Sequence, residues 1–450
     1  MPVDDSRRYR VSRGRLLLIA SAVAFFATFV ATYRAFAVPI FEYFGLGFND
    51  DLGVEYWILI VVLALAPAAW LPTTLKRPST FLLIVQYFIV YVPGLLLAFH
   101  GAKPRLDEAT SVTLACTLFA GLTVMQAGQR FLPVVDISRP AKSSVVFWSI
   151  LIGFGVICVT YLVAVLGANF KLVSFSDVYI VRQAAAEALG ETGSRYGIYA
   201  FTWLNGVVLP ILFATGVVTR RPLLYAGCAA VYVFLFGIWG GKTSLITPFV
   251  LGGLAVTLRG SPQTWVARLA VCLTALLLLP LLAVGDAPLT EFVRSWLIAL
   301  IQQRTFSSSA LLITQYLDFF TTHPLTLGSH ITGINQLVEY PYDGDIPRTI
   351  GSYFYGHPMT ANANFWAMDG IAGFGLPGIV AMSALCAIVL WLFDCACFGM
   401  DARFVVIALG YMGTNFADVS LFTNLVTGGL VLLTLFLWAM PTGLRQRAGS

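Results

Sequence analysis

Residues 7–38, RRYRVSRGRLLLIASAVAFFATFVATYRAFAV, decide the fold of this chain, because five arginines precede a long apolar run. About 20 residues at 1.5 Å rise cross the hydrocarbon core of a bilayer, so the apolar part, residues 16–38, predicts a membrane-spanning helix. The segment is also similar to a cleaved signal peptide that ends at Ala35-Phe36-Ala37. Its 23 apolar residues exceed a usual signal-peptide core, so we predict an uncleaved anchor.

The rest of the chain repeats this pattern of apolar runs and short loops. Hydrophobic residues make up 58% and charged residues 11%, whereas soluble domains have roughly 45–50% and 25%. We therefore predict an all-α, polytopic membrane helix bundle that forms one transmembrane domain over residues 1–450. The predicted spans, about 12 in number, are 16–38, 55–71, 80–99, 109–126, 144–167, 199–218, 223–239, 243–258, 266–284, 370–393, 402–417 and 421–440. For residues 223–258 a re-entrant hairpin is the alternative, because of Gly240, Gly241 and Pro248.

Basic residues concentrate on one side of this topology. The alternate short loops and the two tails hold 17 of the 27 lysines and arginines. Under the positive-inside rule, these segments and both termini are cytoplasmic. They contain Arg7, Arg8, Arg10, Arg13, Arg15, Lys76, Arg77, Arg130, Arg139, Lys142, Arg220, Arg221, Arg259, Arg268, Arg403, Arg445 and Arg447. The net charge of +5 therefore reflects topology, and we predict no nucleic-acid partner.

Two loops on the other side are long enough to carry chemistry. The first, 168–198, contains Arg182, and the second, 285–369, is the large outside loop with three of the four histidines. Loops of this length are usually functional or disordered. Their content of aromatic and aliphatic residues argues against disorder, so we place the candidate active site outside.

A helix is predicted over 290–320 in the large loop. Arg304, Ser308, Leu311, Gln315 and Asp318 would then share one stripe, at helical spacing. The stripe is either a solvated face or the wall of a polar cavity. In the second case Arg304 would bind an anion, because its planar fork suits phosphate.

The seven cysteines give no sign of a disulfide or a metal site. None of them lies in an outside loop, so no disulfide framework is expected there. Cys395 and Cys397 lack partners at metal-ligand spacing. We predict no metal site and no cofactor.

Several motifs resemble those of the oligosaccharide repeat-unit polymerases, the Wzy-type O-antigen polymerases. They occur in order along the chain and share one side of the membrane. The motifs are Asp177-Val-Tyr179-Ile-Val-Arg182, Gly241-Lys242-Thr243-Ser244, Arg304 followed by Tyr316-Leu-Asp318-Phe-Phe-Thr-Thr-His323-Pro324, Ile350-Gly351-Ser352, and Asn362-Ala-Asn364-Phe365 running into Gly370-Ile-Ala-Gly373-Phe-Gly375-Leu-Pro-Gly378.

The resemblance implies a glycosyltransferase of the bacterial inner membrane with a periplasmic active site. Such an enzyme transfers a growing oligosaccharide from undecaprenyl diphosphate onto another lipid-linked repeat unit. Its partners would be the undecaprenyl-diphosphate-linked oligosaccharide, the bilayer and a chain-length regulator protein. Because the glycosyl-diphosphate bond supplies the energy, no nucleotide is required.

This chemistry needs cations for the diphosphate and a base for the acceptor hydroxyl. For the diphosphate we expect Arg182 and Arg304, then Lys242 and Arg348. For the base we expect His357, then Asp369 and Glu339. The remaining candidates, which would line a polar cavity or cap helices, are Asn364, Asn415, Asp418 and Asn424.

Three other functions stay open at this point. An O-antigen ligase would use closely similar chemistry. A polyprenyl-phosphate-sugar glycosyltransferase would use the acidic pair Asp50-Asp51 in the first outside loop. A lipid-linked oligosaccharide flippase, which is not an enzyme, would be expected to show related halves.

Overall fold

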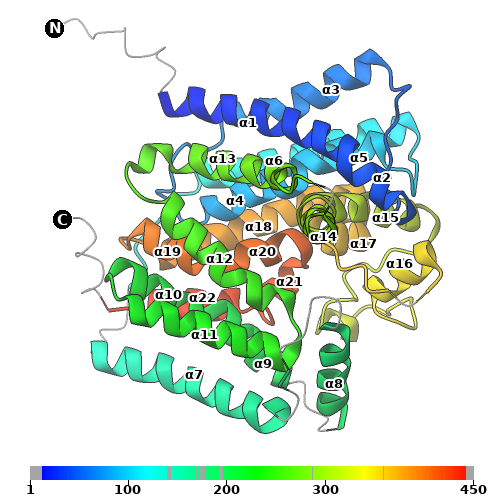
Figure 1. Ribbon diagram of the computed structural model, residues 1–450. Helices are drawn as coiled ribbons and strands as arrows, with labels where there is room; N and C mark the ends of the chain where they lie inside the picture. Colours follow the sequence, from blue (N-terminus) through cyan, green and yellow to red (C-terminus); the bar gives the residue numbers. More distant parts are fainter. Residues whose placement is uncertain are drawn as a thin grey trace, which may run out of the picture. The chain divides into compact units, whose positions relative to one another are not determined.

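Helices account for all the regular structure of the chain in the computed structural model, and no strand occurs among the residues it describes (Figure 1). This confirms the all-α prediction. The structure describes residues 13–138, 143–167, 170–171, 178–191, 196–285, 287–357 and 359–441. Several residues named above lie outside these ranges: Arg7, Arg8, Arg10, Arg139, Lys142, Asp177, Arg445 and Arg447.

Within the described ranges, nine helices are long and apolar enough to cross a membrane. Two of the predicted spans are shorter apolar helices, Val54–Ala69 and Lys242–Thr257. The remaining one, 402–417, is interrupted at Leu409. The chain is thus a membrane protein by the length and composition of its helices.

The chain divides into two compact units, each assembled from separate stretches of sequence. Residues 1–75, 83–130 and 260–387 form unit 1, and residues 76–82, 131–259 and 388–450 form unit 2. Helices α4 (Thr80–Val85), α6 (Glu108–Phe131) and α18 (Leu376–Ala396) have residues in both units.

Unit 1 contains the large loop, residues 285–369, and parts of the three shared helices. Its other helices are α1 (Arg13–Thr32), η2 (Tyr33–Ala37), α2 (Val38–Phe41), η3 (Glu42–Phe44), α3 (Val54–Leu65), η4 (Ala66–Ala69), η5 (Gln86–Tyr91), α5 (Val92–His100), η8 (Pro262–Thr264), α13 (Trp265–Leu278), η9 (Leu279–Leu282), α14 (Pro288–Leu297), η10 (Ile298–Ser307), α15 (Ser308–Thr322), η11 (Ile334–Gln336), α16 (Ile346–Tyr355), η12 (Trp366–Ile371) and α17 (Ala372–Phe374).

The core of unit 1 is built around α5 and α15. Every residue of α5 is buried, as expected for a helix that is apolar on all faces. Helix α15 packs against α5 on one side and against η12 on another. Helix α1 runs along α13. The α15 segment of the large loop is thus part of the core of the unit.

The predicted helix over 290–320 is confirmed. Helix is continuous from α14 through η10 to α15, and η10 has wider π-type turns. Thr305 and Ser308 donate to carbonyls five residues back, Leu300 and Gln303. Ser308, Leu311, Gln315 and Asp318 keep helical spacing within α15, whereas Arg304 lies in η10 and is exposed. Leu311 and Gln315 are fully buried, so the stripe is not a continuous solvated face.

The predicted span 370–393 begins later than expected. Gly375 has φ 66° and ψ −155°, a conformation open mainly to glycine, and it ends the helical segment that contains η12 and α17. A new helix, α18, starts at Leu376. The residues just before this break carry the candidate site described below.

Unit 2 is a bundle in which α10 contacts α11, α12 and α19. Gly240, with φ 67°, ends α11, and α12 starts two residues later, so the pair forms a tight hairpin. The helices of this unit are α7 (Ser144–Leu166), α8 (Val178–Glu191), α9 (Tyr196–Trp203), η7 (Leu204–Val208), α10 (Leu209–Val218), α11 (Pro222–Trp239), α12 (Lys242–Thr257), α19 (Ala402–Ala408), α20 (Gly410–Asp418), α21 (Leu421–Leu425) and α22 (Leu430–Trp438).

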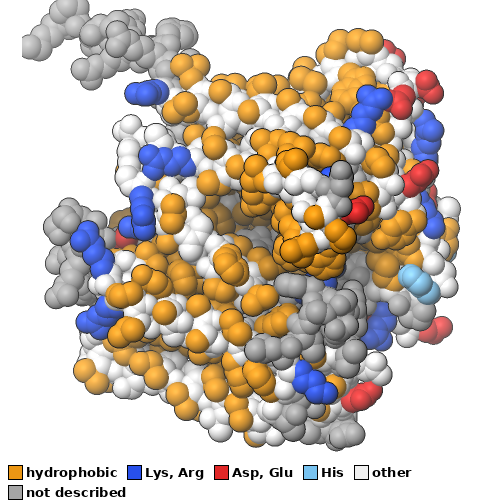
Figure 2. Space-filling view, viewed as in Figure 1, with side chains coloured by type: hydrophobic (Ala, Val, Ile, Leu, Met, Phe, Trp, Pro, Cys, Tyr) orange, Lys and Arg blue, Asp and Glu red, His pale blue; other side chains and the backbone are white. Residues whose placement is uncertain are grey.

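Apolar side chains cover much of the surface over the spans (Figure 2). On α7 they include Val145, Val156 and Ile157, and on the α11–α12 hairpin Leu223 and Phe249, all strongly exposed. Soluble proteins rarely expose apolar patches of this extent, whereas spanning helices face lipid in this way.

Candidate functional site

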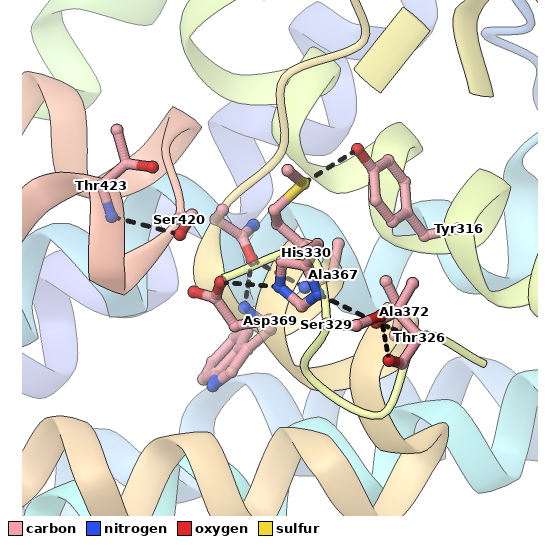
Figure 3. Close-up of polar contacts among 12 residues, drawn as sticks. Tyr316, Thr326, Ser329, His330, Ala367, Asp369, Ala372, Ser420 and Thr423 are labelled. Carbon is pink, nitrogen blue, oxygen red and sulfur yellow. Dashed lines mark hydrogen bonds and ion pairs between the residues drawn. The ribbon is translucent and has the colours of Figure 1, made fainter. Parts of the chain in front are cut away.

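A buried pair, His330 and Asp369, forms the centre of the candidate site in unit 1 (Figure 3). The Nε2 atom of His330 lies 3.4 Å from Oδ1 of Asp369, and the two side chains are 6% and 0% exposed. The other ring nitrogen, Nδ1, lies 2.8 Å from Oγ1 of Thr326. A buried carboxylate is costly unless it is paired, so these contacts are part of what allows Asp369 to be buried.

The backbone of the loop before His330 is tied to the helical segment that carries Asp369. The amides of Thr326 and Leu327 donate to the carbonyls of Ala372 and Gly373. Ser329 closes the turn by donating its hydroxyl to the Thr326 carbonyl. These bonds place Thr326 and His330 against η12 although 39 residues separate His330 from Asp369.

Asn364 starts the segment that carries Asp369. Its side-chain oxygen accepts from the amides of Trp366 and Ala367, at 2.9 and 3.3 Å, which is the usual role of asparagine at a helix start. The indole of Trp366 donates to the Ser383 hydroxyl on α18. Asn364 thus acts as a buried cap, and its Nδ2 atom has no hydrogen-bond partner among the described residues.

Two glycines bring η12 and α18 into backbone contact beside Asp369. A Cβ atom added to Gly378 would lie 2.0 Å from the carbonyl oxygen of Gly370. A side chain at position 378 would therefore clash with the backbone of Gly370, and only glycine fits there. The glycine spacing after Asn364 therefore fixes the position of the segment that holds Asp369.

The Thr326 hydroxyl connects the imidazole of His330 to the backbone of α17. It lies 2.8 Å from His330 Nδ1 and 2.9 Å from the Ala372 carbonyl, and it has a single proton to donate. It can donate this proton to Nδ1 or to the Ala372 carbonyl, and in the second case Nδ1 can donate to the hydroxyl oxygen.

Tyr316 lies close to the pair on α15. Its hydroxyl donates to the Ala361 carbonyl at 3.0 Å and contacts the sulfur of Met368 at 3.4 Å. Complete burial raises the pKa of this phenol, and the negative charge of Asp369 raises it further. Tyr316 therefore stays protonated and keeps the chain around Asp369 in place.

Of the expected residues in unit 1, the structure brings together Asp369 and Asn364. The others are exposed and lie elsewhere. Arg348 pairs with Asp345 at 3.5 Å on the surface. His357 follows α16, with its ring 6.5 Å from that of Tyr355, and Glu339 and Arg304 are exposed on the loop and on η10.

Unit 2 brings Arg182 and Lys242 to one place. The Nε atom of Arg182 on α8 donates to the Gly240 carbonyl at 3.1 Å. Lys242 is the first residue of α12, and the positive end of a helix dipole attracts anions. Ser244 is fully buried there, and its hydroxyl has no partner among the described residues. Two cations, a helix start and a hydroxyl thus occur together.

Asn415 and Asp418 are half-buried on α20 of unit 2, and the Asn415 side chain contacts the Tyr411 hydroxyl. Asn424 is buried, and its amide donates to the Val419 carbonyl. The rest of its hydrogen-bonding capacity is unused among the described residues, because its Oδ1 atom has no partner.

His330 is the residue that sequence reasoning missed. It was counted only as one of three loop histidines, because no spacing relates residue 330 to residue 369. The available signal was its place in the Gly328-Ser329-His330 turn, ahead of the segment Asn364–Gly378. In the described part of the chain, no group of three or more His, Cys, Asp or Glu side chains could hold a metal ion.

Comparisons with protein-family models, with curated proteins and with solved structures found no match for this chain.

Proposed function

We propose that this protein is a membrane glycosyltransferase that extends a lipid-linked oligosaccharide, transferring the growing glycan from undecaprenyl diphosphate onto a second lipid-linked repeat unit. The observation that supports the proposal is the buried Thr326–His330–Asp369 group, in which the two ring nitrogens of His330 lie 2.8 Å from the Thr326 hydroxyl and 3.4 Å from the Asp369 carboxylate. Glycosyl transfer needs such a group, because a sugar hydroxyl is a poor nucleophile while it keeps its proton.

Thr326 is fully buried in this structure, so the proposed reaction requires the turn that holds it to open. The acceptor hydroxyl then donates to Oγ1 of Thr326. Its oxygen forms the bond to the anomeric carbon, while the bond from that carbon to the diphosphate oxygen breaks. The acceptor proton passes to Thr326 as the threonine gives its own proton to Nδ1 of His330. Asp369 stabilises the imidazolium, and the lipid diphosphate leaves with the bonding electrons. The proposal thus moves the base from His357 to His330.

Unit 2 holds a cationic group of its own, which we propose as a binding site for a lipid diphosphate. The start of α12, with Lys242 and Ser244, and the guanidinium of Arg182 together supply charge and hydrogen-bond donors for phosphate oxygens. Arg304 and Arg348 of unit 1 are exposed cations that are further candidates for phosphate.

The alternative function, a polyprenyl-phosphate-sugar glycosyltransferase, relies on Asp50. The structure places Asp50 in an ion pair. Its Oδ1 atom lies 2.6 Å from the Arg34 guanidinium. We favour His330 as the base because its ring lies between a buried hydroxyl and a buried carboxylate, whereas Asp50 is exposed.

Replacing Arg182 with alanine is expected to lower chain extension about 10- to 100-fold, the scale of a lost hydrogen bond to a charged group. Arg182→Lys should not restore it, because one ammonium cannot both reach the Gly240 carbonyl and bind phosphate as a fork. Polysaccharide length in a deletion strain is the measurement, at equal protein level. Arg221→Ala, at an exposed arginine of the same unit, is the control, and long chains from Arg182→Ala would contradict the role.

The proposal also requires both termini in the cytoplasm and residues 285–369 outside. In a cysteine-free background, Gly344→Cys should react with an impermeant thiol reagent in intact cells, or in spheroplasts if an outer membrane blocks it. Gly344 is exposed and has space for a Cβ atom. Ser261→Cys, exposed in a predicted cytoplasmic loop, should react only after lysis. The reverse pattern would overturn the topology.

A further inference from the structure

A groove of about 440 Å³ opens along the outer part of α1 in unit 1. Its floor is apolar, formed by Phe26, Ala27, Val30 and Ala31 on one face of α1. Polar and aromatic residues complete the lining: Arg34, Phe48, Asn49, Asp50 and Trp57. The apolar residues therefore suit a hydrocarbon chain and the polar residues a charged group.

The two charges in the lining are opposite in sign and both accessible. Arg34 and Asp50 form a 2.6 Å ion pair, yet their side chains are 61% and 64% exposed. Exposed pairs contribute little to stability, so a ligand can replace either partner. The Arg34 guanidinium also lies 4.9 Å from the centroid of the Phe48 ring, which keeps the cation over the groove.

The aromatic residues of the groove, Phe48 and Trp57, are held in place by a buried neighbour. The buried ring of His100 stacks on Phe48 at 4.2 Å and contacts Trp57 at 4.9 Å. The Asn49 amide donates to Nδ1 of His100. The Gly47 carbonyl accepts from Tyr33. The loop is thus fixed before any ligand arrives, which lowers the cost of binding.

We propose that this groove binds a zwitterionic phospholipid with a primary amine, phosphatidylethanolamine. Its phosphate would bind Arg34, and its ammonium would donate to Asp50 beside the faces of Phe48 and Trp57. One acyl chain would lie on the Phe26–Ala31 face of α1, which belongs to a candidate membrane span. The site is separate from the groups assigned to glycan transfer, and it does not depend on that assignment.

The opposite charges determine which headgroup fits. Phosphatidylglycerol offers Arg34 a phosphate but brings no cation to Asp50. Phosphatidylcholine brings a cation that cannot donate a hydrogen bond. The ethanolamine headgroup alone of these three satisfies both partners with hydrogen bonds.

Native mass spectrometry of the full chain in detergent tests this, with each of the three lipids added in turn. Wild type should bind phosphatidylethanolamine about two- to fivefold more tightly than the other two, the scale of one exposed charged contact. Arg34→Gln should weaken binding of phosphatidylethanolamine and phosphatidylglycerol alike. Asp50→Asn should remove the preference between them. Arg105→Gln and Asp51→Asn, at exposed positions outside the lining, should match wild type.

The apolar floor is tested by filling it. Ala27→Phe and Ala31→Phe place a ring in the groove from exposed positions and should abolish the preference, whereas Ala275→Phe, on the exposed face of α13, should not. Water-soluble glycerophosphoethanolamine should not compete. Equal phosphatidylethanolamine binding by wild type and all variants, tighter phosphatidylglycerol binding by wild type, or full competition by the soluble headgroup would each overturn the proposal. Unchanged thermal unfolding midpoints show that the variants fold.

Discussion

Replacing His330 with alanine is expected to lower glycan chain extension about 100-fold or more, the usual scale for losing a general base. Asp369→Asn should have a similar effect, since it keeps the shape but leaves the imidazolium without its carboxylate. Thr326→Val should also lower chain extension, because it removes the hydroxyl that passes the proton. Thr326→Ser keeps the hydroxyl and should retain activity. Polysaccharide length in a deletion strain, and initial rates with purified protein, are the measurements.

The exposed histidine of the same loop is the matched control for this prediction. His357→Ala removes an imidazole that contacts neither Asp369 nor Thr326 in the structure, so activity should stay near wild type. A variant that loses activity through misfolding is recognised by a lowered unfolding midpoint. If His357→Ala abolishes extension while a folded His330→Ala extends normally, the base is His357 and the assignment made here is wrong.

Adding a single methyl group at Gly378 is expected to be strongly destabilising. A Cβ atom there would lie 2.0 Å from the Gly370 carbonyl oxygen, and neither backbone can move without displacing η12 or α18. Overpacking usually costs about 1–3 kcal/mol, and a clash between two backbones should be at the upper end. The measurement is the thermal unfolding midpoint of Gly378→Ala in detergent.

Gly227 provides the control, because a Cβ atom added to this residue of α11 meets nothing within 4 Å. Gly227→Ala should be neutral or slightly stabilising, since alanine favours a helix over glycine. If Gly378→Ala unfolds at the wild-type temperature, η12 and α18 are not in the contact described, and the placement of Asp369 is not fixed by it.

Much of the helical architecture follows from the sequence, since apolar runs long enough to cross a bilayer decide where helices occur. The places where these helices are interrupted cannot be predicted from the apolar runs. Gly375 could have continued a helix, and only its φ and ψ show that it ends one. The π-type turns of η10 have no signature in the pattern used, which assumed α-helical spacing between Arg304 and Ser308.

The candidate site was only partly accessible to sequence reasoning. Asn364 and Asp369 lie in one motif, and their residue types suggested a cap and a charged group. Their partner His330 is 39 residues away and reaches Asp369 through backbone bonds between Thr326, Leu327 and α17. The contact between His330 and Asp369 depends on tertiary structure, so no sequence pattern predicts it. The bond from Arg182 to Gly240 was hidden in the same way, although both segments had been singled out.

We propose that this chain joins lipid-linked oligosaccharides using only its own side chains and the energy of the diphosphate bond. The most direct measurement is extension of purified undecaprenyl-diphosphate-linked repeat units by the purified protein, in EDTA and without nucleotides. Wild-type protein should give a ladder of longer glycans, and Asp369→Asn should give about 100-fold less product. No extension by folded wild-type protein, or extension that requires divalent ions or an activated monosaccharide donor, would contradict it.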